Sequence, residues 1–116
     1  MFVSVKVPQD INVGDAVTYD STLQTFTQAA AISTLMGVVI ESASQDQDGH
    51  YYAPVTFAGI AWARASRDIP DEGGVLNVES GGVYVDNSSS SNSIISPLPK
   101  GSNSRLASEL VMIYVR

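Results

Sequence analysis

A two-residue alternation of side-chain character runs through much of the chain and limits what it can fold into. Residues 2–7 (FVSVKV) place a valine at every second position, and in residues 59–65 (GIAWARA) alanines alternate with larger side chains. Successive side chains of a β-strand point to opposite faces of the sheet, so this period predicts strands with one buried face. A helical protein would show a period near 3.6 instead.

Strands of this kind recur at short intervals. We expect them at residues 2–7, 16–19, 23–27, 36–40, 51–57, 59–65, 94–95 and 110–115, with a strand–turn–strand meander over 73–80 and 81–88. Asp20-Ser21 and Asp48-Gly49 predict hairpin turns, and Pro54 predicts a bulge or an edge strand. The segment 28–34 is interpreted as a loop or single turn, and one helical turn at 104–110 is a less favoured alternative to a loop. Together these signals predict an all-β fold, a small antiparallel β-barrel or β-sandwich with short or no helices.

The length of 116 residues (12.3 kDa) is that of one domain. We therefore expect a single β domain over 1–116, with an N-terminal strand or arm at 1–8. Four consecutive serines fall within 87–93, which we expect to be a Ser-rich loop.

Charge and composition exclude several function classes. Only 16% of residues are charged and the net charge is −6. Nucleic-acid binding depends on clustered cations, so no nucleic-acid partner is expected. The chain has no cysteine, which excludes disulfides, thiol nucleophiles and Cys-ligated zinc. No segment approaches the roughly 20 apolar residues of a membrane-spanning helix, and the alternating start does not resemble a signal peptide. We expect no membrane partner and synthesis in a cytoplasm.

The residues that could carry chemistry are few. His50 is the only histidine. No serine lies in a Gly-x-Ser-x-Gly turn that would form a catalytic triad with it, and no cluster of metal ligands is expected beside it. Residues 44–49 resemble half of a calcium loop but lack the bidentate glutamate, so a solvated acidic hairpin is preferred over weak calcium binding. Asp68, Asp71 and Glu72 fall in a turn. We therefore expect no catalytic, metal or cofactor residues, and not an enzyme.

Two groups of residues are better candidates for contacting a protein partner. Phe2, Val3 and Val5 belong to a strand suited to pairing with a partner sheet. Trp62 and Arg64 share one face of the predicted strand 59–65, and these residue types are typical of binding hot spots.

The aromatic residues leave one alternative open. Trp62, Tyr51, Tyr52 and Phe57 are predicted to cluster across one hairpin. Such a cluster is most often core or interface packing, but it can also form a stacking platform for a sugar.

Three segments in order resemble one family. They are Gly14-Asp15-Ala16-Val17, then Met36-Gly37-Val38-Val39-Ile40-Glu41-Ser42-Ala43, then Tyr52-Ala53-Pro54-Val55-Thr56-Phe57-Ala58-Gly59-Ile60-Ala61. This arrangement, over about residues 12–65, resembles the small phage capsid-decoration proteins, also called structural cement proteins. Pro54-Val55-Thr56-Phe57 and the Ser-rich second half depart from that family's pattern.

The resemblance implies a homo-oligomer, commonly a trimer, on the exterior of a virion head, with the major capsid protein of a bacteriophage as its partner. The leading hypothesis is thus a non-enzymatic viral structural protein that stabilises the head. The alternative is a carbohydrate-binding β module of a phage tail or fibre, with Trp62 as its anchor.

Overall fold

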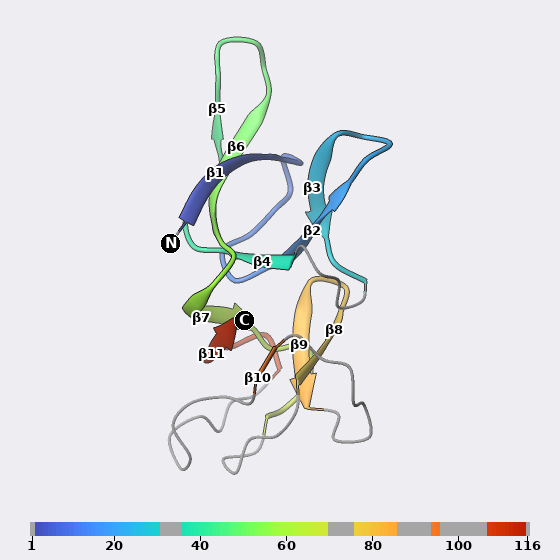
Figure 1. The fold of residues 1–116 in the computed structure, drawn as a ribbon, viewed down its shortest axis with the longest axis vertical. Helices are drawn as coiled ribbons and strands as arrows, with labels where there is room; N and C mark the ends of the chain where they lie inside the picture. The colour runs from blue at the N-terminus through green and yellow to red at the C-terminus, as the bar shows by residue number, and fades with distance from the viewer. Residues whose placement is uncertain (1, 31–35, 70–75, 86–93, 96–106, 116) are drawn as a thin grey trace.

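A computed structural model describes residues 2–30, 36–69, 76–85, 94–95 and 107–115. These residues form eleven strands and no helix (Figure 1). The strands are β1 (Phe2–Val7), β2 (Ala16–Asp20), β3 (Thr25–Gln28), β4 (Met36–Val39), β5 (Ser44–Gln45), β6 (Tyr51–Thr56), β7 (Gly59–Arg64), β8 (Leu76–Glu79), β9 (Gly82–Val85), β10 (Ile94–Ile95) and β11 (Leu110–Val115). The all-β prediction is confirmed.

The first sheet comes from the N-terminal half of the chain. Its order is β1-β6-β4-β2-β3, all antiparallel, and β5 extends the β6 hairpin (Figure 1). β1 and β3, the ends of this order, come close without forming a ladder. The sheet is thus strongly curved but not closed, and the architecture is sandwich-like rather than a barrel.

The second half adds two smaller antiparallel sheets. One has the order β10-β11-β7 and the other is the β8–β9 hairpin. That hairpin turns through Ser80 and Gly81, both with positive φ (48° and 77°), as a two-residue primed turn requires. A parallel bridge between Ala65 and Val83 joins the two small sheets. The predicted meander, the brief strand 94–95 and the last strand are confirmed.

The apolar side chains form two buried clusters. The smaller lies within the curved first sheet and contains Val7, Ile11, Val17, Val39, Ala53 and Val55. The larger joins residues from both halves of the chain: Ala16, Ala29, Met36, Val38, Ala61, Ala63, Ala65, Ile69, Leu76, Val78, Val83, Val111, Ile113 and Val115. The molecule is correspondingly elongated, with extents of 45 × 24 × 23 Å.

Both predicted hairpins have loops longer than two residues. Asp20 pairs with Thr25, so the first hairpin has a four-residue loop in which Gln24 has a φ of 53°. Gln45 pairs with Tyr51, so the second has a five-residue loop, with Gly49 at a φ of 84°. Asp20-Ser21 and Asp48-Gly49 correctly indicated hairpin turns, but such turn signals do not specify loop length.

Pro54 does not mark an edge strand. β6 lies between β1 and β4, with Pro54 opposite Ser4. On its other side, β4 ends at Val39 and β5 begins at Ser44, so the ladder is interrupted where the proline stands. The Pro54 carbonyl still accepts a bond from the Ile40 N–H. The interior strand β6 therefore tolerates a proline, which has no N–H to donate, because its neighbouring strand changes from β4 to β5 at this position.

Other expectations fall wholly or partly outside the described residues: positions 31–34 of the segment 28–34, the turn with Asp71 and Glu72, the meander ends at 73–75 and 86–88, the Ser-rich loop 87–93 and most of the segment 104–110. Within 107–109 the chain makes a turn, with Ser108 at a φ of 76°.

Candidate binding surface on strands β7 and β11

The outward face of β7 and β11 carries large apolar side chains that the molecule leaves uncovered. In the antiparallel register, Ile60 lies opposite Tyr114 and Trp62 lies opposite Met112. Ile60 is 60% exposed and Trp62 is 47% exposed. Side chains of directly paired residues project from the same side of a sheet, so these four form one continuous apolar surface. We call this surface, completed by Leu110, the β7–β11 face.

The inward side of the same strands explains why the outward side is free. Ala61, Ala63, Val111 and Ile113 alternate with the outward residues and are buried in the larger cluster. Small alanines let β7 lie close to the residues beneath it. The sequence left open whether the alanine side packs within the chain or against another subunit, and the structure places it in the chain's own core.

Arg64, the third outward residue of β7, is held by a buried carboxylate. Its Nε donates to Asp15 Oδ1 at 3.0 Å, and its terminal nitrogen donates to the Ser80 carbonyl at 2.9 Å. Asp15 is fully buried and also accepts bonds from the Gln28 side chain and the Asn12 N–H, each at 3.0 Å. A buried charge is tolerated only with such partners. The Arg64 side chain remains 27% exposed at the end of the face.

The Gly14-Asp15 turn thus joins the first sheet to β7. The Gly14 N–H donates to the Val39 carbonyl, and the Gly14 carbonyl accepts from the Arg64 N–H, both at 2.8 Å. Gly14 has a φ of 91°, and a Cβ there would lie 2.5 Å from the Leu110 side chain. In this chain, Gly14 and Asp15 of the first motif of the resemblance therefore connect the first sheet to β7.

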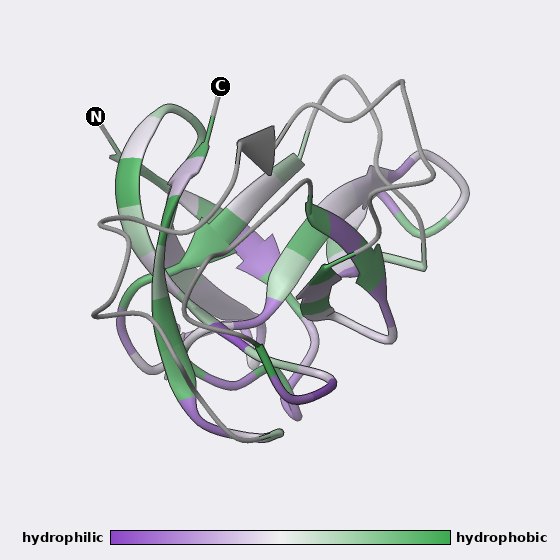
Figure 2. Ribbon diagram, turned by 90° about the horizontal axis from the view of Figure 1, so that it is seen from below, coloured by the Kyte–Doolittle hydropathy of each residue, from purple (hydrophilic) through white to green (hydrophobic). Residues whose placement is uncertain are grey.

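The N-terminal strand is a second exposed apolar region. Phe2 is 60% exposed and Val3 is 49% exposed, whereas Val5 is half-buried against the smaller cluster. β1 pairs with β6 along one edge, and no described strand forms a ladder with its other edge. Such an edge can accept an added strand. β1 begins on the side of the molecule where β11 ends (Figures 1 and 2).

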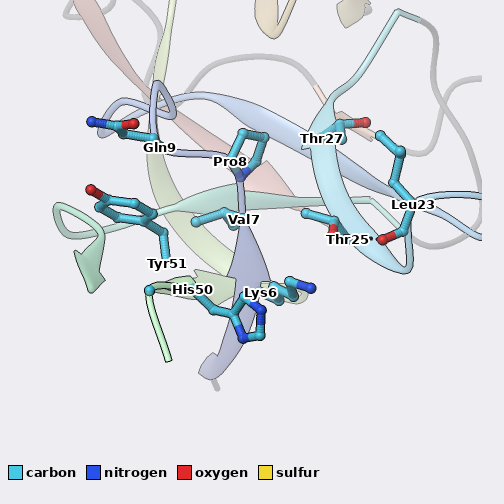
Figure 3. A pocket seen from close by; sticks show the side chains of 10 residues that line it. Lys6, Val7, Pro8, Gln9, Leu23, Thr25, Thr27, His50 and Tyr51 are labelled. Carbon is cyan, nitrogen blue, oxygen red and sulfur yellow. Dashed lines mark hydrogen bonds between the residues drawn. The ribbon is translucent and has the colours of Figure 1, made fainter. Parts of the chain in front are cut away.

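A pocket of about 330 Å³ lies between the end of β1, β3 and the β5–β6 hairpin (Figure 3). Its walls are mainly carbon atoms of Val7, Pro8, Leu23 and Tyr51, among others. Lys6 and His50 also line it, and Lys6 forms no ion pair with the described residues. The sequence did not indicate this pocket, because it is formed by three segments far apart in the chain.

His50 is exposed, as expected for a turn residue, but it has potential co-ligands that we did not expect. Ligand atoms of Asp46, Asp48 and His50 all lie within 4.8 Å of one another. The loop folds around Asp46 Oδ1, which accepts bonds from the Asp48 and His50 N–H groups at 2.9 Å. Within the part of the chain that the structure describes, this group of three exposed residues is the one that could hold a metal ion. Asp68, by contrast, accepts a bond from the Ala107 N–H at 2.8 Å.

The predicted aromatic cluster is wrong. Phe57 packs against Phe26 with ring centroids 5.5 Å apart, and Phe26 in turn packs against Tyr19. Trp62 lies on a different sheet, because β7 pairs with β11 and not with β6. Gly59, with a φ of 102°, turns the chain between the two sheets. Of the partner-contact residues predicted from the sequence, Trp62 and Arg64 share a face, whereas Phe2, Val3 and Val5 belong to the separate β1.

Sequence reasoning missed Leu110, Met112 and Tyr114, the half of the face contributed by β11. Their alternation with buried residues was visible in 110–115, but nothing in the sequence pairs this segment with 59–64.

Comparisons of the chain with family models, curated proteins and solved structures gave no match in any of the three. Among the described residues, no helix has the length and apolar character needed to cross a membrane.

Proposed function

We propose that this protein is a non-enzymatic structural protein that binds and stabilises the outside of a phage head. The observation that carries the proposal is the β7–β11 face. Ile60, Trp62 and Tyr114 together expose a contiguous apolar surface, and such surfaces mark sites of protein contact. The resemblance over residues 12–65 supplies the identity of the partner, the major capsid protein, and the place on the virion exterior.

The β1 edge supports the same proposal. Phe2 and Val3 flank a strand edge that has no ladder partner among the described strands. Strand addition to a capsid subunit would satisfy these backbone groups and cover both side chains. The resemblance further predicts a homo-oligomer, with a trimer as the common arrangement.

A co-sedimentation experiment tests the proposal. Purified protein is mixed with expanded heads that lack it, and the bound fraction is measured after pelleting. We expect saturable binding that Ile60→Lys weakens, because a charge in the β7–β11 face opposes apolar contact, and that Val3→Lys also weakens, because a charge at the β1 edge opposes strand addition. Leu23→Lys is the matched control, since Leu23 is 60% exposed on the β2–β3 loop. Absence of wild-type binding to the heads contradicts the proposal.

The alternative is a carbohydrate-binding module, and the exposure of Trp62 favours it. A sugar platform also needs hydrogen-bonding groups beside the ring. Beside Trp62 on the face, Ile60 and Met112 offer none, and Arg64 already donates to Asp15 and to the Ser80 carbonyl, which leaves the Tyr114 hydroxyl. Quenching of the single tryptophan by added saccharides, together with no binding to heads, would favour the alternative.

A further inference from the structure

We propose that the pocket between β1, β3 and the β5–β6 hairpin binds a small organic carboxylate with an apolar body, such as an aromatic or branched aliphatic acid. In this assignment the ammonium group of Lys6 pairs with the carboxylate, and the pocket walls cover the apolar body. The site is separate from the proposed function, which uses the β7–β11 face and the Phe2 and Val3 end of β1.

The pocket exists because the first sheet does not close. β1 and β3 approach each other without forming a ladder, and the β5–β6 hairpin, in which Tyr51 pairs with Val7, forms a third wall (Figure 3). The volume of about 330 Å³ is at the lower end of the range for small-molecule sites. The pocket therefore fits a ligand with a single ring or a short branched chain better than a nucleotide or an oligosaccharide.

The walls of the pocket present uncovered apolar surface. Figure 3 shows Tyr51 and Leu23 on opposite sides of Val7 and Pro8. Leu23 is 60% exposed, and Tyr51 and Pro8 are half-buried. An apolar body that lies between Tyr51 and Leu23 removes these carbon surfaces and its own from water, which favours binding.

Lys6 is the feature that specifies a negatively charged group. The other Lys and Arg residues in the described part of the chain are Arg64 and Arg67, and each pairs with an acidic side chain. Lys6 is half-buried and forms no ion pair with the described residues. None of the described residues that line the pocket is acidic. An ammonium group without an ionic partner, beside apolar walls, attracts a carboxylate more strongly than it would in open water.

The surroundings of the pocket favour one negative charge over two. Besides Lys6, the lining offers the His50 imidazole and the hydroxyl of Thr27, whose side chain forms no hydrogen bond with another described residue. Asp46 and Asp48 lie next to His50, with ligand atoms of the three residues within 4.8 Å of one another. These carboxylates repel a phosphate, which carries up to about two negative charges at pH 7, more strongly than a monoanion. A carboxylate is therefore the better match for a single ammonium group.

A ¹H–¹⁵N NMR titration of the full chain with 3-phenylpropanoate tests the site. We expect saturable binding with a dissociation constant on the order of 1 mM, and shifts of the amide signals of Val7, Thr27 and Tyr51. The neutral 3-phenylpropanamide keeps the ring and lacks the charge, whereas acetate keeps the charge and lacks the ring. Each should bind about fivefold or more weakly, because each makes only one of the two contacts.

Two pairs of variants locate the contacts. Lys6→Met keeps the apolar stem and removes the charge, so the affinity should fall about fivefold or more. Arg67→Gln is its control, since it also removes one positive charge but lies outside the pocket lining. Leu23→Ser removes a wall and should weaken binding, whereas Ile60→Ser, at a position with the same 60% exposure on the β7–β11 face, should not. The dispersion of the NMR spectrum verifies that each variant folds.

Several results would overturn the inference. They are the absence of saturable shifts at the pocket, equal binding of the amide, or equal weakening by Arg67→Gln and Lys6→Met. Tighter binding of phenyl phosphate would overturn the assignment in favour of a phosphate ligand. Much tighter binding of a short peptide that ends in phenylalanine would overturn it in favour of a peptide C-terminus. The titration contains no phage heads, so its failure leaves the proposed function standing, and a failure of head binding leaves the ligand site standing.

Discussion

The two faces of β7 and β11 differ in side-chain size and in what covers them. The inward residues, such as Ala63 and Ile113, lie in the larger cluster and are inaccessible to solvent. The outward residues, such as Ile60 and Trp62, are larger on average than the inward ones of β7 and remain about half exposed. Adjacent positions on one strand therefore have separate roles: the inward residues stabilise the fold, and the outward residues are available to a partner.

The largest effect should come from the inward face. Ile113→Ala removes a fully buried side chain and leaves a cavity, so the free energy of unfolding should fall by about 2–5 kcal/mol. Tyr114→Ala, one residue along and 39% exposed, should cost about 1 kcal/mol or less. Urea unfolding monitored by circular dichroism measures both. Equal losses would mean that the two faces do not differ as described.

The second-largest effect should come from Asp15, which connects the first sheet to Arg64 of β7. Asp15→Ala leaves Arg64 and the Gln28 amide without their acceptor, and the free energy of unfolding should fall by about 2–3 kcal/mol. The loss is below that of a fully buried pair because water can reach the partly exposed Arg64. Asp20→Ala is the control, since this half-buried aspartate accepts its bonds from two N–H groups of its own turn. It should cost about 0.5–1 kcal/mol.

Trp62→Ala should separate association from stability. The free energy of unfolding should change by about 1 kcal/mol or less, while the affinity for phage heads should fall about tenfold or more. Tyr19→Ala is the control, because Tyr19 lies on the first sheet and is 46% exposed, against 47% for Trp62. It should leave the affinity of the folded protein for phage heads unchanged. If both variants weaken association equally, the β7–β11 face is not the specific contact.

The smallest effect concerns pH and lies away from both faces. Arg67 donates to both carboxylate oxygens of Glu79, at 2.7 and 3.0 Å, and this bonding holds the pKa of Glu79 below its ordinary 4.5. A lowered pKa stabilises the fold above the unfolded-state value, and the stabilisation is lost as pH falls through the folded-state value. Glu79→Gln should therefore have a slightly lower melting temperature than the wild type at pH 7, and the difference should vanish in acid. Arg67→Gln should remove the same pH-dependent difference, and persistence of that difference would assign it to another group.

The alternation within 59–65 correctly predicted that Trp62 and Arg64 share a face opposite to the alanines. Their partners were not predictable in the same way. Asp15 lies 49 residues from Arg64, and a strand's period does not specify which distant carboxylate it approaches. The cluster of Asp46, Asp48 and His50 was also missed, because a hairpin signal at Asp48-Gly49 does not specify how a five-residue loop brings these side chains together.

The sequence by itself determined the all-β class, the positions of most strands and the division of each strand into two faces. These are local properties, since the two-residue period follows from strand geometry alone. Only the tertiary structure decided that β6 and β7 belong to different sheets, that β11 pairs with β7, and which face of that pair stays bare. The physical reason is that strand pairing and register depend on packing between segments far apart in the chain, and alternation restricts that packing without selecting the partner.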